Sequence, residues 1–385
     1  MDRVKELFKK NTMIIALIVV TLFFTITTGG TLLVPQNVTN LIAQNGYVVI
    51  LAVGMLMCIL TGGNIDLSIG SVVCLIEAIA GTLIVNKGMN NLTAIIICLV
   101  VGIVIGMIQG YWIAYLRIPA FIVTLAGMLL WRGVALIVLD GLTISPFPES
   151  YLKLFNSYVP DIFQGSINIL SIVLGFIVCV IYVVIKSLTR ISRRKKGYQP
   201  EAALSEISQI VIICVVIMAF AFSMAYHKGI PMILILLAVI VFAYTYYTTK
   251  TVPGRYLYAM GGNEKAAKLS GINTNRVLFF AYVNMAFLSA VAALVCVARF
   301  NSAAPTAGMN YEMDAIGACY IGGASAYGGI GSVPRVVIGA IFMGVINNGM
   351  SIMGIDSNVQ KVVKGIVLLA AVTFDVLSKK RGRLA

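Results

Sequence analysis

The sequence predicts an all-α membrane protein that crosses a bilayer about ten to twelve times. Hydrophobic residues make up 60% of the 385 residues and charged residues only 11%, unlike the composition of a soluble domain. The apolar runs are long and continuous, as at 95–108, whereas the strands of an outer-membrane barrel alternate. Because lipid offers no hydrogen bonds to the backbone, helices are the expected way to cross it.

The predicted spans follow the apolar runs along the chain. They fall at 12–28, 38–60, 67–85, 92–115, 119–139, 167–186, 209–226, 230–248, 277–298, 312–327, 334–353 and 358–377. The run at 312–327 is short and rich in glycine, so a broken or re-entrant element is also open. We expect it to cross, because a re-entrant element would leave the basic C-terminal tail outside.

The distribution of charge orients these spans. With the N-terminus inside, alternation places most of the 28 Lys and Arg residues on the cytoplasmic side, as the positive-inside rule requires. The net charge of +14 therefore indicates topology rather than nucleic-acid binding. Both termini, a basic loop at 187–208 and a loop at 250–276 are then cytoplasmic, and the loop at 140–166 is external. The basic loop is expected to lie against anionic membrane lipids.

The N-terminal segment and the reactive side chains, the cysteines and the histidine, show no pattern of a catalytic or metal site. The basic flank of the first span resembles a signal peptide, but no convincing cleavage site precedes Pro35, so we expect an uncleaved anchor. The seven cysteines lie in apolar runs without a C-x-x-C pair, and His227 is the single histidine. No metal site, cofactor or catalytic residue is predicted, and a membrane-embedded enzyme is disfavoured.

Glycine recurs every four residues in the fourth predicted span, at Gly102, Gly106 and Gly110. These positions share one face of a helix, and a stripe of small residues lets another helix approach closely. We expect this face to pack against a neighbouring helix.

A short polar segment, 261–272, interrupts the apolar runs on the cytoplasmic side. Asn263 can cap a helix, Glu264 suits its first turn and Gly271 suits its end. A helix of this length extends about 10 Å and is too short and too charged to cross a bilayer. It is either a surface that a partner grips or a solvated loop.

Several segments together resemble the permease subunits of sugar ABC importers of the ribose, xylose and galactose type. The resemblance covers nearly the whole chain, and the order and spacing of the segments carry it. They are 63–71, 261–272, 304–308 with 311–316, 322–325 with 328–329, and 347–349.

The resemblance implies a single permease domain over 1–385 with the ABC importer permease fold, in a bacterial cell membrane. It also implies a homodimer that works with a cytoplasmic ABC ATPase subunit and an extracytoplasmic sugar-binding protein. The chain has no G-x-x-x-x-G-K-[ST] motif, so ATP must be hydrolysed by another polypeptide. The added pair of spans near 167–226 is typical of longer xylose-type and multiple-sugar permeases, which makes xylose, galactose or a similar sugar a better candidate than ribose.

In this resemblance the polar segment is the element that couples the permease to its ATPase. The candidate coupling residues are Gly262, Asn263, Glu264, Ala266, Ala267, Ser270 and Gly271.

Charged residues near or within the spans are candidates for a gate or a pathway. Asp66, with Ser68 just beyond, starts the third span and either caps a helix or forms a polar hinge. Glu77 lies about 16 Å into the hydrocarbon core and Arg132 about 20 Å. A charge at such depth needs protein or water around it, so we hypothesise a Glu77–Arg132 pair. The alternative is a protonated Glu77 with Arg132 reaching outward.

The pathway for a sugar should be only mildly polar, because tight binding would trap the substrate. Side-chain amides both donate and accept, and they can also simply bond helix to helix. The candidates are Gln44, Asn45, Asn64, Asn347 and Asn348. A branched-chain amino-acid permease of related plan and a secondary transporter are the competing functions.

Overall fold

The computed structural model describes residues 12–163, 165, 167–195 and 203–384. Within them the regular structure is helical, apart from two isolated β bridges, Ile144–Ala303 and Tyr158–Pro231. The helices are α2 Thr12–Thr27, α3 Pro35–Leu60, α4 Ile69–Gly81, α5 Asn91–Ala114, α6 Ala120–Leu139, α7 Glu149–Asn156, α8 Ile169–Lys195, α9 Ala203–Ala225, α10 Met232–Lys250, α11 Val252–Gly262, α12 Glu264–Leu269, α13 Thr274–Phe300, α14 Tyr311–Ile321, α15 Val333–Ile352 and α16 Ser357–Leu384.

The predicted all-α membrane class is confirmed. In the described part of the chain, eight helices are long and apolar enough to cross a membrane: α3, α4 with the π-helical turn Thr82–Asn86 that continues it, α5, α6, α8, α10, α13 and α15. Shorter apolar helices lie at Met13–Thr27 and Gln209–Ala225. The full set of twelve crossings stays a prediction.

The chain divides into two compact units. The first contains 41–156, the described residues up to 32 and those from 233 onward, and the second contains 33–40 and 157–232. In the second unit, α8 and α9 form a hairpin in which Gly175 faces the methyl group of Ala221. The extra hairpin expected from the sequence is therefore present. The single permease domain stays a prediction.

The core of the first unit is built around α3 and α13. Residues 48–60 of α3 are buried on every side, so this helix is enclosed by protein rather than lipid. The glycine stripe of α5 packs on α13 as expected, because a Cβ on Gly102 would lie 2.6 Å from the Cβ of Ala290. Six cysteines are buried, which fits the expected core role; they are Cys58, Cys74, Cys98, Cys179, Cys296 and Cys319.

Two helices of the first unit begin after irregular backbone. α4 follows the irregular segment 61–68, and α14 follows 301–310. At 11 residues α14 extends only about 16 Å, roughly half of the hydrocarbon core. Irregular backbone at such depth is tolerated where protein encloses it.

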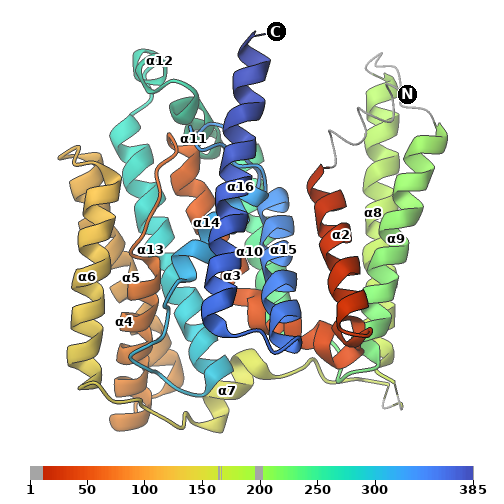
Figure 1. Ribbon diagram of the computed structural model, residues 1–385, viewed down its shortest axis with the longest axis horizontal. Helices are drawn as coiled ribbons and strands as arrows, with labels where there is room; N and C mark the ends of the chain where they lie inside the picture. Colours follow the sequence, from red (N-terminus) through yellow and green to blue (C-terminus); the bar gives the residue numbers. More distant parts are fainter. Residues whose placement is uncertain (1–11, 164, 166, 196–202, 385) are drawn as a thin grey trace. The chain divides into compact units, whose positions relative to one another are not determined.

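The contacts at both ends of the α14 segment show where it runs. Figure 1 shows α7 at one end of the first unit and α11 and α12 at the other. Ala303 pairs with Ile144, which follows α6 and precedes α7. At the other end, the amide of Gly329 donates to the carbonyl of Leu60 beside α11. This path supports a crossing by a broken helix at 312–327 rather than re-entry.

Candidate functional site

The polar segment at 261–272 forms the helix that the sequence predicts. Asn263 ends α11 and starts α12, and its side-chain oxygen accepts from the amide of Ala266 at 3.0 Å. Gly271 ends the turn with a φ of +83°, a conformation that glycine adopts without strain. We call α11, α12 and the turn up to residue 273 the coupling hairpin, after the coupling role that the resemblance implies and that stays a prediction.

The exposed apolar residue of α12 is not among those expected. Ala267 is buried at 5% exposure and faces the protein, whereas Leu269 is 91% exposed. The other candidates Gly262, Ala266 and Ser270 are exposed, and Glu264 is half-buried. An exposed apolar side chain often marks a contact surface, and the sequence alone does not show that Leu269 faces outward.

Arg117 joins the turn before α6 to the coupling hairpin. Its guanidinium lies 2.7 Å from the carboxylate of Glu264, and the two side chains are 41% and 42% exposed. The same guanidinium donates to the hydroxyl of Thr274 at 3.0 Å and to the side chain of Asn275. An exposed pair contributes little stability, so its main effect is to orient α12.

α11 lies directly on backbone from two distant segments. A Cβ on Gly261 would sit 1.9 Å from the carbonyl oxygen of Leu60 and 2.4 Å from the amide of Gly329. The hydroxyl of Tyr258 donates to the carbonyl of Gly331 at 3.1 Å. Backbone therefore touches backbone between α11 and the loop 322–332 that follows α14.

Asp66 and Ser68 shape the start of α4. The Asp66 carboxylate accepts from the amide of Ser68 at 2.8 Å and from its hydroxyl at 2.6 Å. The amide of Gln109 on α5 donates to the same hydroxyl at 2.9 Å. All three side chains are buried. Ser68 is the N-cap residue of α4 and no side chain caps this helix, so Asp66 forms a turn before the helix instead of the expected cap, and a gating role stays a prediction.

The described residues form no direct ion pair between Glu77 and Arg132, although the Arg132 charge still acts on the Glu77 carboxyl. Arg132 donates to the backbone carbonyls of Pro305 at 3.1 Å and Ala307 at 2.6 Å, in the irregular segment before α14. Glu77 is 2% exposed, and its Oε1 has no hydrogen-bond partner among the described residues. Carbonyl dipoles therefore compensate the guanidinium, and the Arg132 side chain is half-buried.

A buried ion pair that the sequence analysis missed links α14 to α16. The Nζ of Lys364 lies 2.9 Å from one carboxylate oxygen of Asp314 and 3.2 Å from the other. Their side chains are 19% and 3% exposed, and the hydroxyl of Tyr47 on α3 also donates to Asp314 at 3.2 Å. Asp314 is a carboxylate in an apolar run, the same signal that singled out Glu77.

Four of the five candidate amides gather between α3 and α15. Asn348 donates to Gln44 at 3.2 Å, and the side chain of Asn45 packs on Gly344 while donating to its own helix. The side-chain oxygen of Asn347 is buried without a hydrogen-bond partner in the described part of the chain. The fifth, Asn64, instead contacts Thr61 before α4. The pathway roles of all five stay predictions.

Comparison with known proteins places the chain in a transport family. Residues 37–372 match the family described as the permease component of the branched-chain amino acid transport system. The match covers most of the chain, which therefore belongs to this family. The protein is a multi-pass permease of the cell membrane and not an enzyme.

The individual proteins that the chain resembles include sugar permeases. The xylose transport system permease protein XylH of Haemophilus influenzae is 36% identical over 96% of this chain and 96% of its own length. XylH of Escherichia coli K12 is 37% identical over 96% and 92%. The ribose import permease protein RbsC of Escherichia coli K12 is 34% identical over 88% and 85%. No solved structure matches the chain significantly.

Proposed function

We propose that this chain is the membrane-spanning permease of an ABC importer for a monosaccharide, with xylose as the first candidate. Two xylose permeases match at 36–37% identity over almost their full lengths, and a ribose permease matches over less of both chains. The α8–α9 hairpin agrees with the longer, xylose-type plan. Galactose or a similar sugar remains an alternative cargo.

The partners follow from what the chain lacks. Without a phosphate-binding loop of its own, it needs a cytoplasmic ABC ATPase, and an external sugar-binding protein delivers the cargo. Two copies of the permease form the conduit. In this assembly the coupling hairpin is the element that the ATPase moves, with the exposed Leu269 as its apolar contact.

The observation that carries the proposal is the backbone contact between the coupling hairpin and the loop after α14. Motion of α12 passes through Gly261 to Leu60 and Gly329. The loop 322–332 leads directly back to α14, which holds the buried Asp314. A push on the cytoplasmic side thereby reaches a broken helix in the membrane interior.

The broken helix lies next to the polar groups that a sugar could use. Tyr47, Asp314 and Lys364 form one hydrogen-bonded cluster, and the amides of Gln44 and Asn348 lie further along α3 and α15. Hydroxyl groups of a sugar can both donate to and accept from these side chains. Most of these groups already have protein partners, so they would hold a passing sugar only weakly.

The Asp314–Lys364 pair also favours a second candidate, a branched-chain amino acid. A zwitterion carries both charges, and this pair offers an opposite partner for each, in agreement with the family description. Sugar transport differs in a measurable way, because an uncharged cargo does not need to open an ion pair in the membrane.

The test is reconstitution of the permease in proteoliposomes with its ATPase and each candidate binding protein. We expect ATP-dependent uptake of xylose and stimulation of ATPase activity by xylose with the sugar-binding protein. Uptake of leucine or valine instead would establish the second candidate. Uphill transport by the permease alone would refute an ATP-driven importer.

A further inference from the structure

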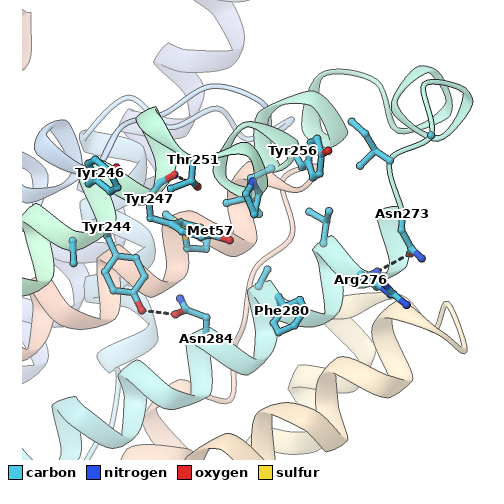
Figure 2. Close-up of a pocket in the computed structure, with 17 residues that line it drawn as sticks. Met57, Tyr244, Tyr246, Tyr247, Thr251, Tyr256, Asn273, Arg276, Phe280 and Asn284 are labelled. Carbon is cyan, nitrogen blue, oxygen red and sulfur yellow. Dashed lines mark hydrogen bonds between the residues drawn. The ribbon is translucent and has the colours of Figure 1, made fainter.

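Next to the coupling hairpin, the first unit contains a large cavity of about 810 Å³. It lies among α3, α10, α11 and the start of α13, and the turn after α12 closes one side (Figure 2). Its volume is in the upper part of the range of ligand sites, about 300–1,000 Å³. The hypothesised sugar pathway uses none of the residues that line it.

The lining of the cavity is amphipathic. Figure 2 shows Tyr244, Tyr246 and Tyr247 on α10 facing it from one side, and Phe280 on α13 from the other. Tyrosine is enriched where protein meets the headgroup level of a membrane. The described residues that line the cavity include no acidic side chain.

Arg276 and Asn284 supply hydrogen-bond donors to the cavity, beside hydroxyl and amide oxygens that also accept. Arg276 is exposed in the first turns of α13, and its guanidinium takes part in none of the ion pairs found in the described residues. Deeper in the cavity, the side-chain nitrogen of Asn284 is buried and, in the part of the chain that the structure describes, without an acceptor. The two residues are eight apart on α13, so about 12 Å separates them along the helix.

We propose that this cavity binds an anionic phospholipid of the inner leaflet. The phosphate of the lipid lies at Arg276, its glycerol esters accept from donors deeper in the cavity, and its acyl chains run along Phe280 and the apolar side of α10. A cation at the rim and apolar walls match the two ends of such a lipid, and a basic residue at the membrane surface favours anionic lipid. The proposal rests on the cytoplasmic side assigned to α12.

The test measures lipid retained by the full-length permease. The protein is exchanged into micelles that contain equal amounts of phosphatidylglycerol and phosphatidylcholine, and bound lipid is counted by native mass spectrometry. Arg276→Gln removes the charge at the rim, and Ala243→Phe fills the cavity from an exposed position on α10. Arg255→Gln is the matched control, since Arg255 is exposed on α11 but does not line the cavity.

We expect the wild type and Arg255→Gln to prefer phosphatidylglycerol. Arg276→Gln should lower this preference about fivefold, and Ala243→Phe should lower retention of both lipids. No preference in the wild type, or equal losses in the two arginine variants, would overturn the proposal. Sugar uptake is measured in parallel, so a failure of the lipid proposal can be told apart from a failure of the proposed transport function.

Discussion

Arg132 donates a hydrogen bond of 2.6 Å to the carbonyl oxygen of Ala307. The two residues come from α6 and from the irregular segment before α14, where backbone carbonyls have no helical partner. A guanidinium has five N–H donors in a planar fork, so one side chain can satisfy several such oxygens. Arg132 therefore allows α14 to begin in the membrane interior, in addition to compensating its own charge.

Replacing Arg132 with methionine should destabilise the permease. Methionine keeps a similar apolar stem but leaves the carbonyl of Ala307 unsatisfied, which costs about 1–3 kcal/mol, and leaves that of Pro305 with only the weak thiol donor of Cys74. We expect a lower melting temperature in detergent and less protein in the membrane. Arg299→Met is the control, because Arg299 belongs to the last turn of α13 outside this network. Equal stability of the two variants would contradict this role of Arg132.

The unpartnered carboxyl of Glu77 leads to an opposite expectation. Because Oε1 is buried and has no partner in the described residues, Glu77→Gln replaces a costly group with a neutral one of the same shape. We expect unchanged or higher stability and retained uptake. The double charge exchange, Glu77→Arg with Arg132→Glu, should not restore the protein, since a carboxylate cannot donate to Pro305 and Ala307. Restoration would revive the ion-pair hypothesis.

The Asp314–Lys364 pair should show strong coupling in a double-mutant cycle. Either Asp314→Leu or Lys364→Met alone leaves a buried charge without its partner and should cost about 3–5 kcal/mol. The double variant should recover most of that stability, because an apolar pair avoids the desolvation cost. Thermal unfolding of the four proteins measures the coupling, and additive losses would show that the pair is not energetically linked.

The same double variant separates stability from transport. If the pair lies on the sugar pathway, the double variant, with its stability recovered, should reach the membrane yet take up sugar more slowly. Uptake equal to the wild type would make the pair purely structural.

Leu269 offers a sharper test of coupling than Ala267. A charged residue at Ala267 would disturb buried packing, so loss of uptake there would not identify a partner contact. Leu269→Asp changes an outward side chain and should leave the permease folded while ATP hydrolysis no longer drives uptake. Leu142→Asp, at an exposed leucine in the loop between α6 and α7, is the control. Normal ATP-dependent sugar uptake by Leu269→Asp would show that Leu269 is not needed for coupling and would refute the role proposed for α12.

The local signals in the sequence predicted local structure well. Most bounds expected from the apolar runs lie within three residues of the helix bounds, whereas one end each of α8, α9, α14 and α16 misses by six to nine, and Asn263 caps α12 as its chemistry suggests. These features depend on neighbours along the chain. The partners of Arg132 depend on an irregular segment more than 170 positions away, as the hydrogen bonds show. Backbone carbonyls have no sequence signature, so the sequence pointed to Glu77, the acidic residue at a similar membrane depth, and not to the carbonyls that Arg132 contacts.

The orientation of the coupling hairpin also depends on contacts that the sequence does not show. A six-residue helix has too few turns for its apolar period to show which side faces the protein, so the sequence did not separate Ala267 from Leu269. The close approach of Gly261 to Leu60 likewise joins residues about 200 positions apart. The sequence predicted the polar segment 261–272, whereas its contacts with the rest of the protein are visible only in the structure.

Gly261 tests the mechanical link itself. An added methyl group there would lie 1.9 Å from the carbonyl oxygen of Leu60, so Gly261→Ala must push α11 away from the loop 322–332. Forcing extra volume into packed protein costs about 1–3 kcal/mol, and we expect a matching loss of thermal stability together with weaker stimulation of ATPase activity by sugar. Gly133→Ala on α6 makes the same chemical change where nothing lies within 4 Å and should be neutral or slightly stabilising. A Gly261→Ala variant that is destabilised but fully coupled would show that the contact holds the fold without transmitting motion.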